Sequence, residues 1–156
     1  MSGVYSAQFT GVAITAAQDL FELVAGSGKP IVVLGFEIGQ TTDVGDAAEE
    51  ILSLNFNSGQ TTSGSGGSSV TPAATDTGNT VAASATCEAN NTTKASAGTI
   101  LTHWSGTWNI RVPQEKVFTQ EQQIIIAASR RCTLELVGAP ADSITVNGTI
   151  WFQEIG

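Results

Sequence analysis

The chain has 156 residues and a formal net charge of −8, from 14 acidic and 6 basic residues. Hydrophobic residues make up 41% of it, enough for the core of one domain, while charged residues make up 13%, against a usual share of about 25%. The excess of acidic over basic residues argues against nucleic-acid binding, because phosphate contacts need clustered Lys and Arg.

Alternating apolar and polar residues predict strands in the first third of the chain, because a half-buried strand has a period of two. We expect these strands at residues 5–15, 19–24, 31–38 and 51–56, with a turn at 25–30 and a polar loop at 39–46. In the clearest run, the residues expected to point inward are Val32, Leu34, Phe36 and Ile38.

Residues 57–98 have a different composition. Residues 58–69 are rich in Gly, Ser and Thr, as flexible linkers are. A short strand is predicted at about residues 80–87. A compact domain seldom keeps a long irregular segment without a use, so we expect a flexible excursion, about residues 57–79, at one end of the fold.

The next predicted strand, residues 99–112, carries Trp104 and Trp108 in one phase. The simpler interpretation makes them core aromatics. The alternative is a sugar-stacking platform or a subunit interface. His103, the only histidine, falls in the opposite, polar phase, where a solvent-facing role is expected. Pro113 ends the strand because it has no N–H to donate.

Three more strands are predicted at residues 122–128, 132–137 and 143–154. In the last of them, one face carries Ile144, Val146, Ile150 and Phe152. The total is about eight or nine short strands, with no sustained helical period. This pattern predicts an all-β fold, an antiparallel β-sandwich of the jelly-roll type, with residues 1–156 as a single domain.

Motifs for catalysis or metal binding are weak. We expect Cys87 and Cys132 to be buried, reduced thiols, since Cys132 shares the apolar phase of Leu134 and Leu136. A reducing compartment disfavours a disulfide, and a metal site is not expected because neither has a second Cys or His at ligand spacing. The densest acidic group lacks the spacing of a calcium loop, so a solvated loop is expected; it comprises Asp43, Asp46, Glu49 and Glu50. One histidine and no nucleophile turn give a Ser-His-Asp triad little support, although a glycosidase carboxylate pair stays open because such acids meet in space. We therefore expect that the protein is not an enzyme and binds no cofactor.

Four sequence blocks resemble a family of small proteins encoded by tailed bacteriophages and prophages. In order along the chain, the blocks are residues 19–23 (DLFEL), 38–46 (IGQTTDVGD), 88–93 (EANNTT) and 139–143 (APADS) leading to 152–154 (FQE). They span most of the chain. The resemblance implies a virion protein, similar to the jelly-roll decoration (cement) proteins of capsids.

The expected function is therefore a non-enzymatic decoration protein that stabilises the outer surface of a phage capsid. Its expected partners are the major capsid protein and copies of itself, as a trimer. An N-terminal arm, about residues 1–9, would supply contacts through Tyr5 and Phe9, and Trp104 and Trp108 are further interface candidates. The alternatives are a tail or fibre-tip adhesin that binds a glycan, and a glycan-binding or glycan-processing protein.

The expected location is the virion. The N-terminus lacks the charged and apolar regions of a signal peptide, so synthesis in the host cytoplasm is expected. No stretch approaches the roughly 20 apolar residues of a membrane span, and we expect no membrane partner.

Overall fold

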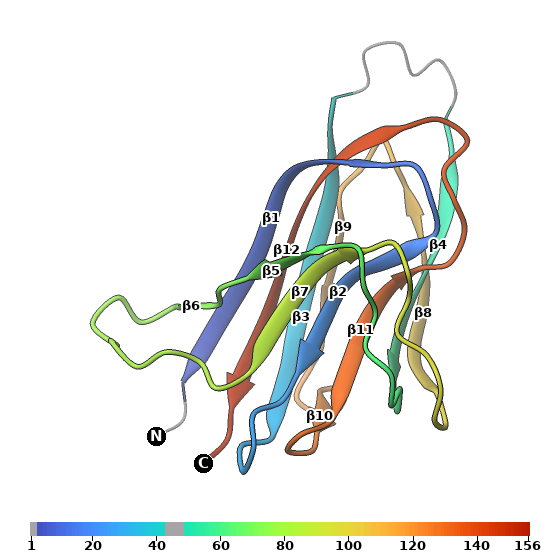
Figure 1. Ribbon diagram of the computed structural model, residues 1–156. Coiled ribbons are helices and arrows are strands. Elements are labelled where there is room, and N and C mark those ends of the chain that lie inside the picture. The colour runs from blue at the N-terminus through green and yellow to red at the C-terminus, as the bar shows by residue number, and fades with distance from the viewer. Residues whose placement is uncertain (1–2, 43–48) are drawn as a thin grey trace.

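The computed structural model describes residues 3–42 and 49–156, which form two antiparallel sheets packed face to face (Figure 1). This arrangement confirms the predicted antiparallel β-sandwich. The described residues contain twelve strands: β1 (Val4–Ile14), β2 (Gln18–Val24), β3 (Ile31–Thr42), β4 (Ile51–Ser58), β5 (Ser68–Val70), β6 (Ala73–Ala74), β7 (Thr86–Asn91), β8 (Leu101–Asn109), β9 (Gln114–Val117), β10 (Ile124–Ile126), β11 (Arg131–Leu136) and β12 (Ile144–Glu154).

The strand order is that of a jelly roll. Sheet A runs β10-β3-β12-β1-β6, with β9 also paired to β3, and sheet B runs β5-β7-β2-β11-β4-β8. The pairs are nested along the chain: β1 with β12, β2 with β11, β3 with β9 and β10, and β4 with β8. Successive pairs alternate between the sheets, as in one long hairpin rolled into a sandwich.

Strands beyond the predicted eight or nine come mainly from one insertion. β5 and β6 were not predicted, and β7 (Thr86–Asn91) stands in place of the strand predicted at about residues 80–87; all three lie within residues 59–98, between β4 and β8. They extend sheet B beyond β2 and sheet A beyond β1. Another comes from residues 114–117, where a connection was expected and β9 is found. β9 and β10 together occupy one strand position, because both pair with the same edge of β3.

The core lies between the inner faces of the two sheets. Its largest fully buried side chains include Phe36 on β3, Phe56 on β4, Trp108 on β8 and Phe152 on β12. The predicted inward face of β12 is confirmed, since Ile144, Val146, Ile150 and Phe152 are all buried. Such alternation follows from the period of two in a strand with one face on the core.

The predicted phase of β3 is only half right. Phe36 and Ile38 are fully buried, as expected. The pairing with β12 shifts between Trp151 and Phe152, and this bulge leaves Leu34 without a partner in the ladder. A bulge reverses the faces of the residues beyond it. Val33 therefore points inward, and Val32 lies on the outer face opposite the exposed Ile125, although it is itself only 7% exposed.

The predicted free N-terminal arm is wrong from residue 4 onward. β1 lies within sheet A, paired to β12 on one side and to β6 on the other. Tyr5 and Phe9 are 2% and 7% exposed. The ring of Tyr5 stacks on Phe152 at 5.7 Å between centroids, and that of Phe9 packs on Phe21 at 5.1 Å. These aromatics hold the core together.

The predicted flexible excursion is instead a structured part of the insertion. Two bridges, Thr62 with Ser96 and Ser65 with Thr93, join its outgoing and returning arms. The arms lie against the outer face of sheet B, where the Gln60 amide donates to Thr133 Oγ1 at 3.0 Å. Thr133 is consequently buried although it faces away from the core.

Candidate functional site

The two outer faces of the sandwich differ in what covers them. On sheet B, the outward-facing Asp19, Glu22 and Thr133 are all buried under the insertion. On sheet A, outward-facing side chains such as Gln8 on β1 and Glu37 on β3 are exposed. The cover on sheet B is partial, since Ser53 on β4 and Ser105 and Thr107 on β8 are exposed. No comparable cover lies over the outer face of sheet A in the described residues, and we consider that face the candidate site.

Contacts under the insertion are polar and specific. Glu22 accepts hydrogen bonds from Ser63 Oγ, from Gly64 N and from the Asn91 amide, at 2.9–3.0 Å. The Arg131 Nε lies 3.5 Å from the same carboxylate. A buried carboxylate with this many donors holds the insertion in place. We assign Glu22 a structural role.

Asp19 is a second carboxylate that binds the insertion. Its Oδ2 accepts a hydrogen bond of 2.7 Å from Ala95 N. The pKa of the Asp19 carboxyl is raised from 3.8 to about 7, mainly by burial and also by the nearby Glu135 and Glu22, while the Ala95 hydrogen bond and Lys94 oppose the rise. Lys94 pairs with Glu135 at 2.7 Å.

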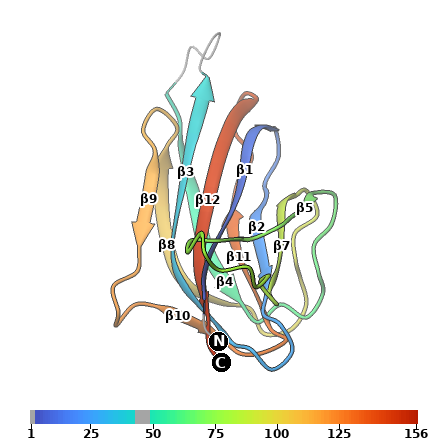
Figure 2. The same cartoon turned by 90° about the vertical axis from the view of Figure 1, so that its left-hand side faces the viewer.

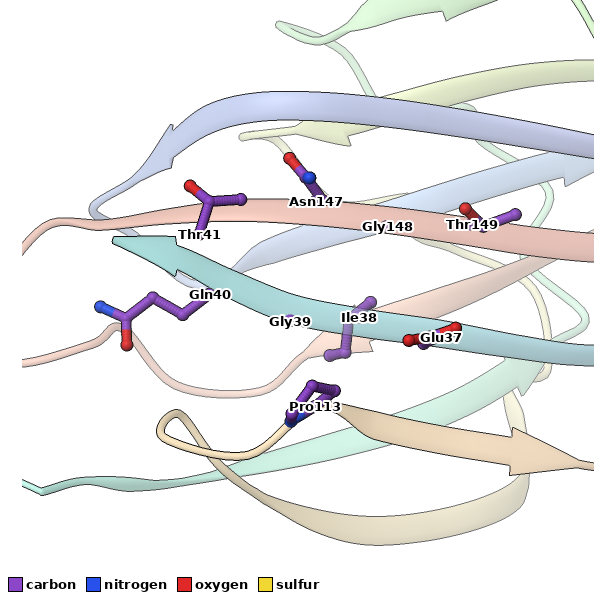
Figure 3. A pocket seen from close by; sticks show the side chains of 9 residues that line it. All are labelled: Glu37, Ile38, Gly39, Gln40, Thr41, Pro113, Asn147, Gly148 and Thr149. Carbon is purple, nitrogen blue, oxygen red and sulfur yellow. The ribbon is translucent and has the colours of Figure 1, made fainter. Parts of the chain in front are cut away.

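One part of the sheet A face is a shallow polar groove of about 260 Å³. Figure 3 shows Gly39 of β3 flanked by side chains of β12 on one side and by Pro113 on the other. Gly39 pairs with Asn147, whose Oδ1 accepts a 2.7 Å hydrogen bond from Gly11 N. The groove is lined by Glu37, Ile38, Gly39, Gln40, Thr41, Pro113, Asn147, Gly148 and Thr149.

The other part of the face is apolar. Val117 on β9 and Ile125 on β10 are 63% and 66% exposed. Trp151 and Val117 both pair with Gly35, and Val32 pairs with Ile125, so neighbouring strands bring these residues onto one surface. Trp151 is half-buried, and Val32 is 7% exposed beneath its neighbours. We call Val32, Val117, Ile125 and Trp151 the sheet A patch, in which Val117 and Ile125 supply most of the exposed apolar surface.

Two carboxylates lie between the groove and the sheet A patch. Glu37 of β3 is directly opposite Glu115 of β9 in the ladder, and both side chains are exposed. Like charges directly opposite each other destabilise an antiparallel pair. Among the outward-facing strand positions that the structure describes on sheet A, the charged residues are these two, so the face is acidic.

The site residues expected from the sequence do not gather on a surface. Tyr5, Phe9 and Trp108 are buried, and the Trp108 Nε1 donates to Val112 O at 3.0 Å. Trp104 is half-buried, with its ring edge-on to Phe36 at 5.3 Å. The core interpretation of the tryptophans is thus the one that the structure supports.

Sequence reasoning missed the residues of the sheet A patch. Trp151 stands in the polar phase of β12, between the inward Ile150 and Phe152, and this position was its signal. Ile125 lies in a continuous apolar run, where no alternation reveals which residue points outward.

The two cysteines and the acidic group singled out in the sequence lie in separate places. Cys87 and Cys132 are free and buried, and burial raises the pKa of the Cys87 thiol to about 12. Of the acidic group, Glu49 accepts from the Asn109 amide and Glu50 accepts from Ala141 N, while Asp43 and Asp46 lie outside the described residues. Over residues 3–42 and 49–156, no three His, Cys, Asp or Glu side chains are grouped to hold a metal ion.

His103 contacts Ser58 at the surface. Its Nε2 lies 2.6 Å from Ser58 Oγ in an exposed contact. The pair bridges β8 and β4. No carboxylate is recorded against His103 in the described part of the chain, so the arrangement is a cross-strand polar contact.

No family model, curated protein or solved structure matches the chain. In the described residues, no helix has the length and hydropathy that crossing a membrane requires.

Proposed function

We propose that the protein is a structural component of a bacteriophage virion, a decoration protein that docks on the outer surface of the capsid through the outer face of sheet A. The observation that carries this proposal is the contrast between the two outer faces. The insertion covers the outer face of sheet B over β2 and β11, whereas Val117 and Ile125 on the outer face of sheet A are mostly exposed.

The face has the layout of a protein interface. Interfaces place apolar and aromatic side chains at the centre and polar ones at the rim. Here the sheet A patch supplies the apolar centre, with Trp151 as its aromatic, and the polar groove supplies one rim. Glu37 and Glu115 favour a partner surface that presents Lys or Arg, because charge complementarity guides docking. The partner we propose is the major capsid protein.

The protein would stabilise the capsid by binding alone, without catalysing a reaction. A protein that binds only the assembled lattice stabilises it by RT ln(1 + [L]/Kd) for each occupied site. Many sites on one particle add up against the pressure of the packaged DNA. The docking contacts come from the rigid sheet A face, since Tyr5 and Phe9 are committed to the core.

The test uses particles of the phage or induced prophage that encodes the protein. A Val117→Ser/Ile125→Ser double variant removes the exposed apolar contacts, and we expect at least about a tenfold loss of copies per particle, roughly 1.4 kcal/mol of docking free energy. A Val81→Ser/Ile155→Ser double variant is the matched control, because both residues are exposed elsewhere. Absence of the native protein from purified particles, or equal loss in both variants, would contradict the proposal.

A second candidate function is a glycan-binding adhesin on the phage tail. The observation that favours it is the polar groove, where the Asn147 amide is held in place and Glu37 and Thr149 lie nearby. Amide, hydroxyl and carboxylate groups around an open floor suit sugar hydroxyls. Binding to host polysaccharide that Asn147→Ala abolishes, with the protein found at the tail, would select this function over decoration.

A further inference from the structure

Strand β8 is a free edge of sheet B. It spans nine residues, Leu101–Asn109, and pairs with β4 on one side. It stands last in the order of sheet B, and no other described strand pairs with it. Figure 2 shows β8 on the same side of the sandwich as β9 and β10, away from the insertion.

This edge lacks most of the features that keep strands from pairing with another chain. Natural proteins protect long edges with Lys, with other charges, with Pro or with bulges. β8 contains no Lys, Arg, Asp, Glu or Pro. One bulge interrupts it at His103, where the register with β4 shifts. Residues 104–109 then run in unbroken register and leave outward backbone groups without a strand partner.

The two ends of β8 are both apolar and exposed. Ile100 and Leu101 lie at the start of the strand. At its other end lie Val112 and Ile51, the latter directly opposite Asn109 on β4. These four are among the nine large hydrophobic side chains that are exposed in the described residues. They therefore concentrate along one edge.

This layout is self-complementary. When two copies of one strand pair antiparallel about a two-fold axis, the start of each lies beside the end of the other. The Leu101 end of one copy would then meet the Val112 and Ile51 end of its partner, at both ends of the contact. The centre of the contact carries Ser105 and Thr107, which are uncharged, so the acidic chains meet along a neutral strand.

We propose that β8 pairs with β8 of a second copy of this chain, so that sheet B continues across a two-fold dimer. This contact replaces the trimer expected from the sequence, because an isologous edge closes with two copies. It does not rest on the proposed capsid function, since the outer face of sheet A stays free in such a dimer.

The test measures the molar mass of the purified protein by light scattering over a range of concentrations. We expect a dimer. A Thr107→Lys variant places two like charges next to the two-fold axis and is expected to be monomeric, whereas Thr10→Lys, the same change on the exposed face of β1, stays dimeric. Circular dichroism checks that both variants fold.

Cysteine crosslinking gives a second test, in which the expected result is the gain of a covalent dimer and not a loss of association that misfolding could also cause. Ser105→Cys and Thr107→Cys place thiols near the proposed axis, and the two native cysteines are buried. We expect mild oxidation to link two chains in at least one of these variants. A monomer at every concentration, a trimer, or a Thr107→Lys dimer without crosslinking at either position overturns the proposal.

Discussion

The Glu37–Glu115 pair should lower the stability of the free protein while favouring its binding to a partner. The two carboxylates face each other across β3 and β9, on the face that we propose as the docking surface, and no basic side chain of the described residues pairs with either of them. In the free protein they repel each other. Against a partner that presents Lys or Arg they would attract, so the pair is useful only when the face is occupied.

A Glu115→Gln substitution should therefore raise the free energy of unfolding by a few tenths of a kcal/mol, up to about 1 kcal/mol. The same change should lower the number of copies on the particle. Urea unfolding and quantitative mass spectrometry of particles measure the two effects. Lower stability together with unchanged occupancy would show that Glu115 acts in neither way.

Glycines explain why composition misled the prediction for residues 58–69. Gly59 has φ of +93°, and a Cβ there would lie 2.0 Å from Thr99 O. A Cβ at Gly67 would lie 2.1 Å from Ala89 O. These glycines allow backbones to approach closely under hydrogen bonds. A Gly-rich run has the same composition whether it is a linker or a tightly packed turn, so sequence alone could not distinguish them.

A Gly59→Ala substitution should cost on the order of 1–3 kcal/mol of unfolding free energy, because it adds both a strained φ and a clash with backbone. Gly138→Ala is the matched control, since no atom lies within 4 Å of a Cβ there. Thermal unfolding compares the two. Equal melting temperatures would mean that the insertion yields without cost.

At the scale of elements, three buried carboxylates hold the insertion on the sandwich: Glu22, Asp19 and Glu154. Glu154 Oε1 at the end of β12 accepts from Ser84 N, Ser84 Oγ and Ala85 N, at 2.6–2.9 Å. Burial raises the pKa of Glu154, but these hydrogen bonds and Lys29 outweigh it, so the pKa lies below 4.5. Its contribution to stability is present above that ordinary value and is lost as the pH falls through the lowered pKa.

The contribution of Asp19 to stability depends on pH in the opposite direction to that of Glu154. Because the pKa of Asp19 is raised from 3.8 to about 7, its contribution is full below pH 4 and is lost as the pH rises to about 7. We expect the unfolding free energy of the native protein to fall across this window, by on the order of 2–4 kcal/mol. In Asp19→Asn that part of the slope should vanish, while exposed Asp76→Asn keeps it. An unchanged slope in Asp19→Asn, measured by urea unfolding at several pH values, would count against this assignment.

Strand elements with one face on the core could be predicted well. β11 and β12 alternate cleanly, and Leu134, Leu136 and Phe152 are buried as expected. β3 was harder because its phase changes at a bulge set by the register with β12, a pairing that sequence does not reveal. β2 is buried on both faces, inward by Phe21 and outward by Glu22, because the insertion covers it.

At the scale of the molecule, the jelly roll depends on its two terminal strands. β1 and β12 pair along their whole length, from Val4 opposite Gln153 to Ile14 opposite Ile144. Both lie in the interior of sheet A. The sequence predicted the fold class because alternation and turn spacing are local signals. It could not show that the first strand pairs with the last, which is a long-range contact.

Deletion of residues 2–9 should therefore abolish folding, since it removes the buried Tyr5 and Phe9 together with most of the β1 ladder. Loss of each buried aromatic alone costs about 3–5 kcal/mol, and typical domains have 5–15 kcal/mol in total. Circular dichroism and solubility test this directly. A folded, soluble truncated protein would show that the N-terminal segment is dispensable, as an arm would be.

The central claim is that the protein occupies the phage capsid with the outer face of sheet A against the lattice. Imaging of the purified particle at residue-level resolution tests it most directly. We expect density for the jelly roll on the outer capsid surface, with Val117, Ile125 and Trp151 buried against the major capsid protein and Glu37 or Glu115 near its Lys or Arg side chains. Density in which sheet A faces solvent, or particles that lack the protein altogether, would contradict it.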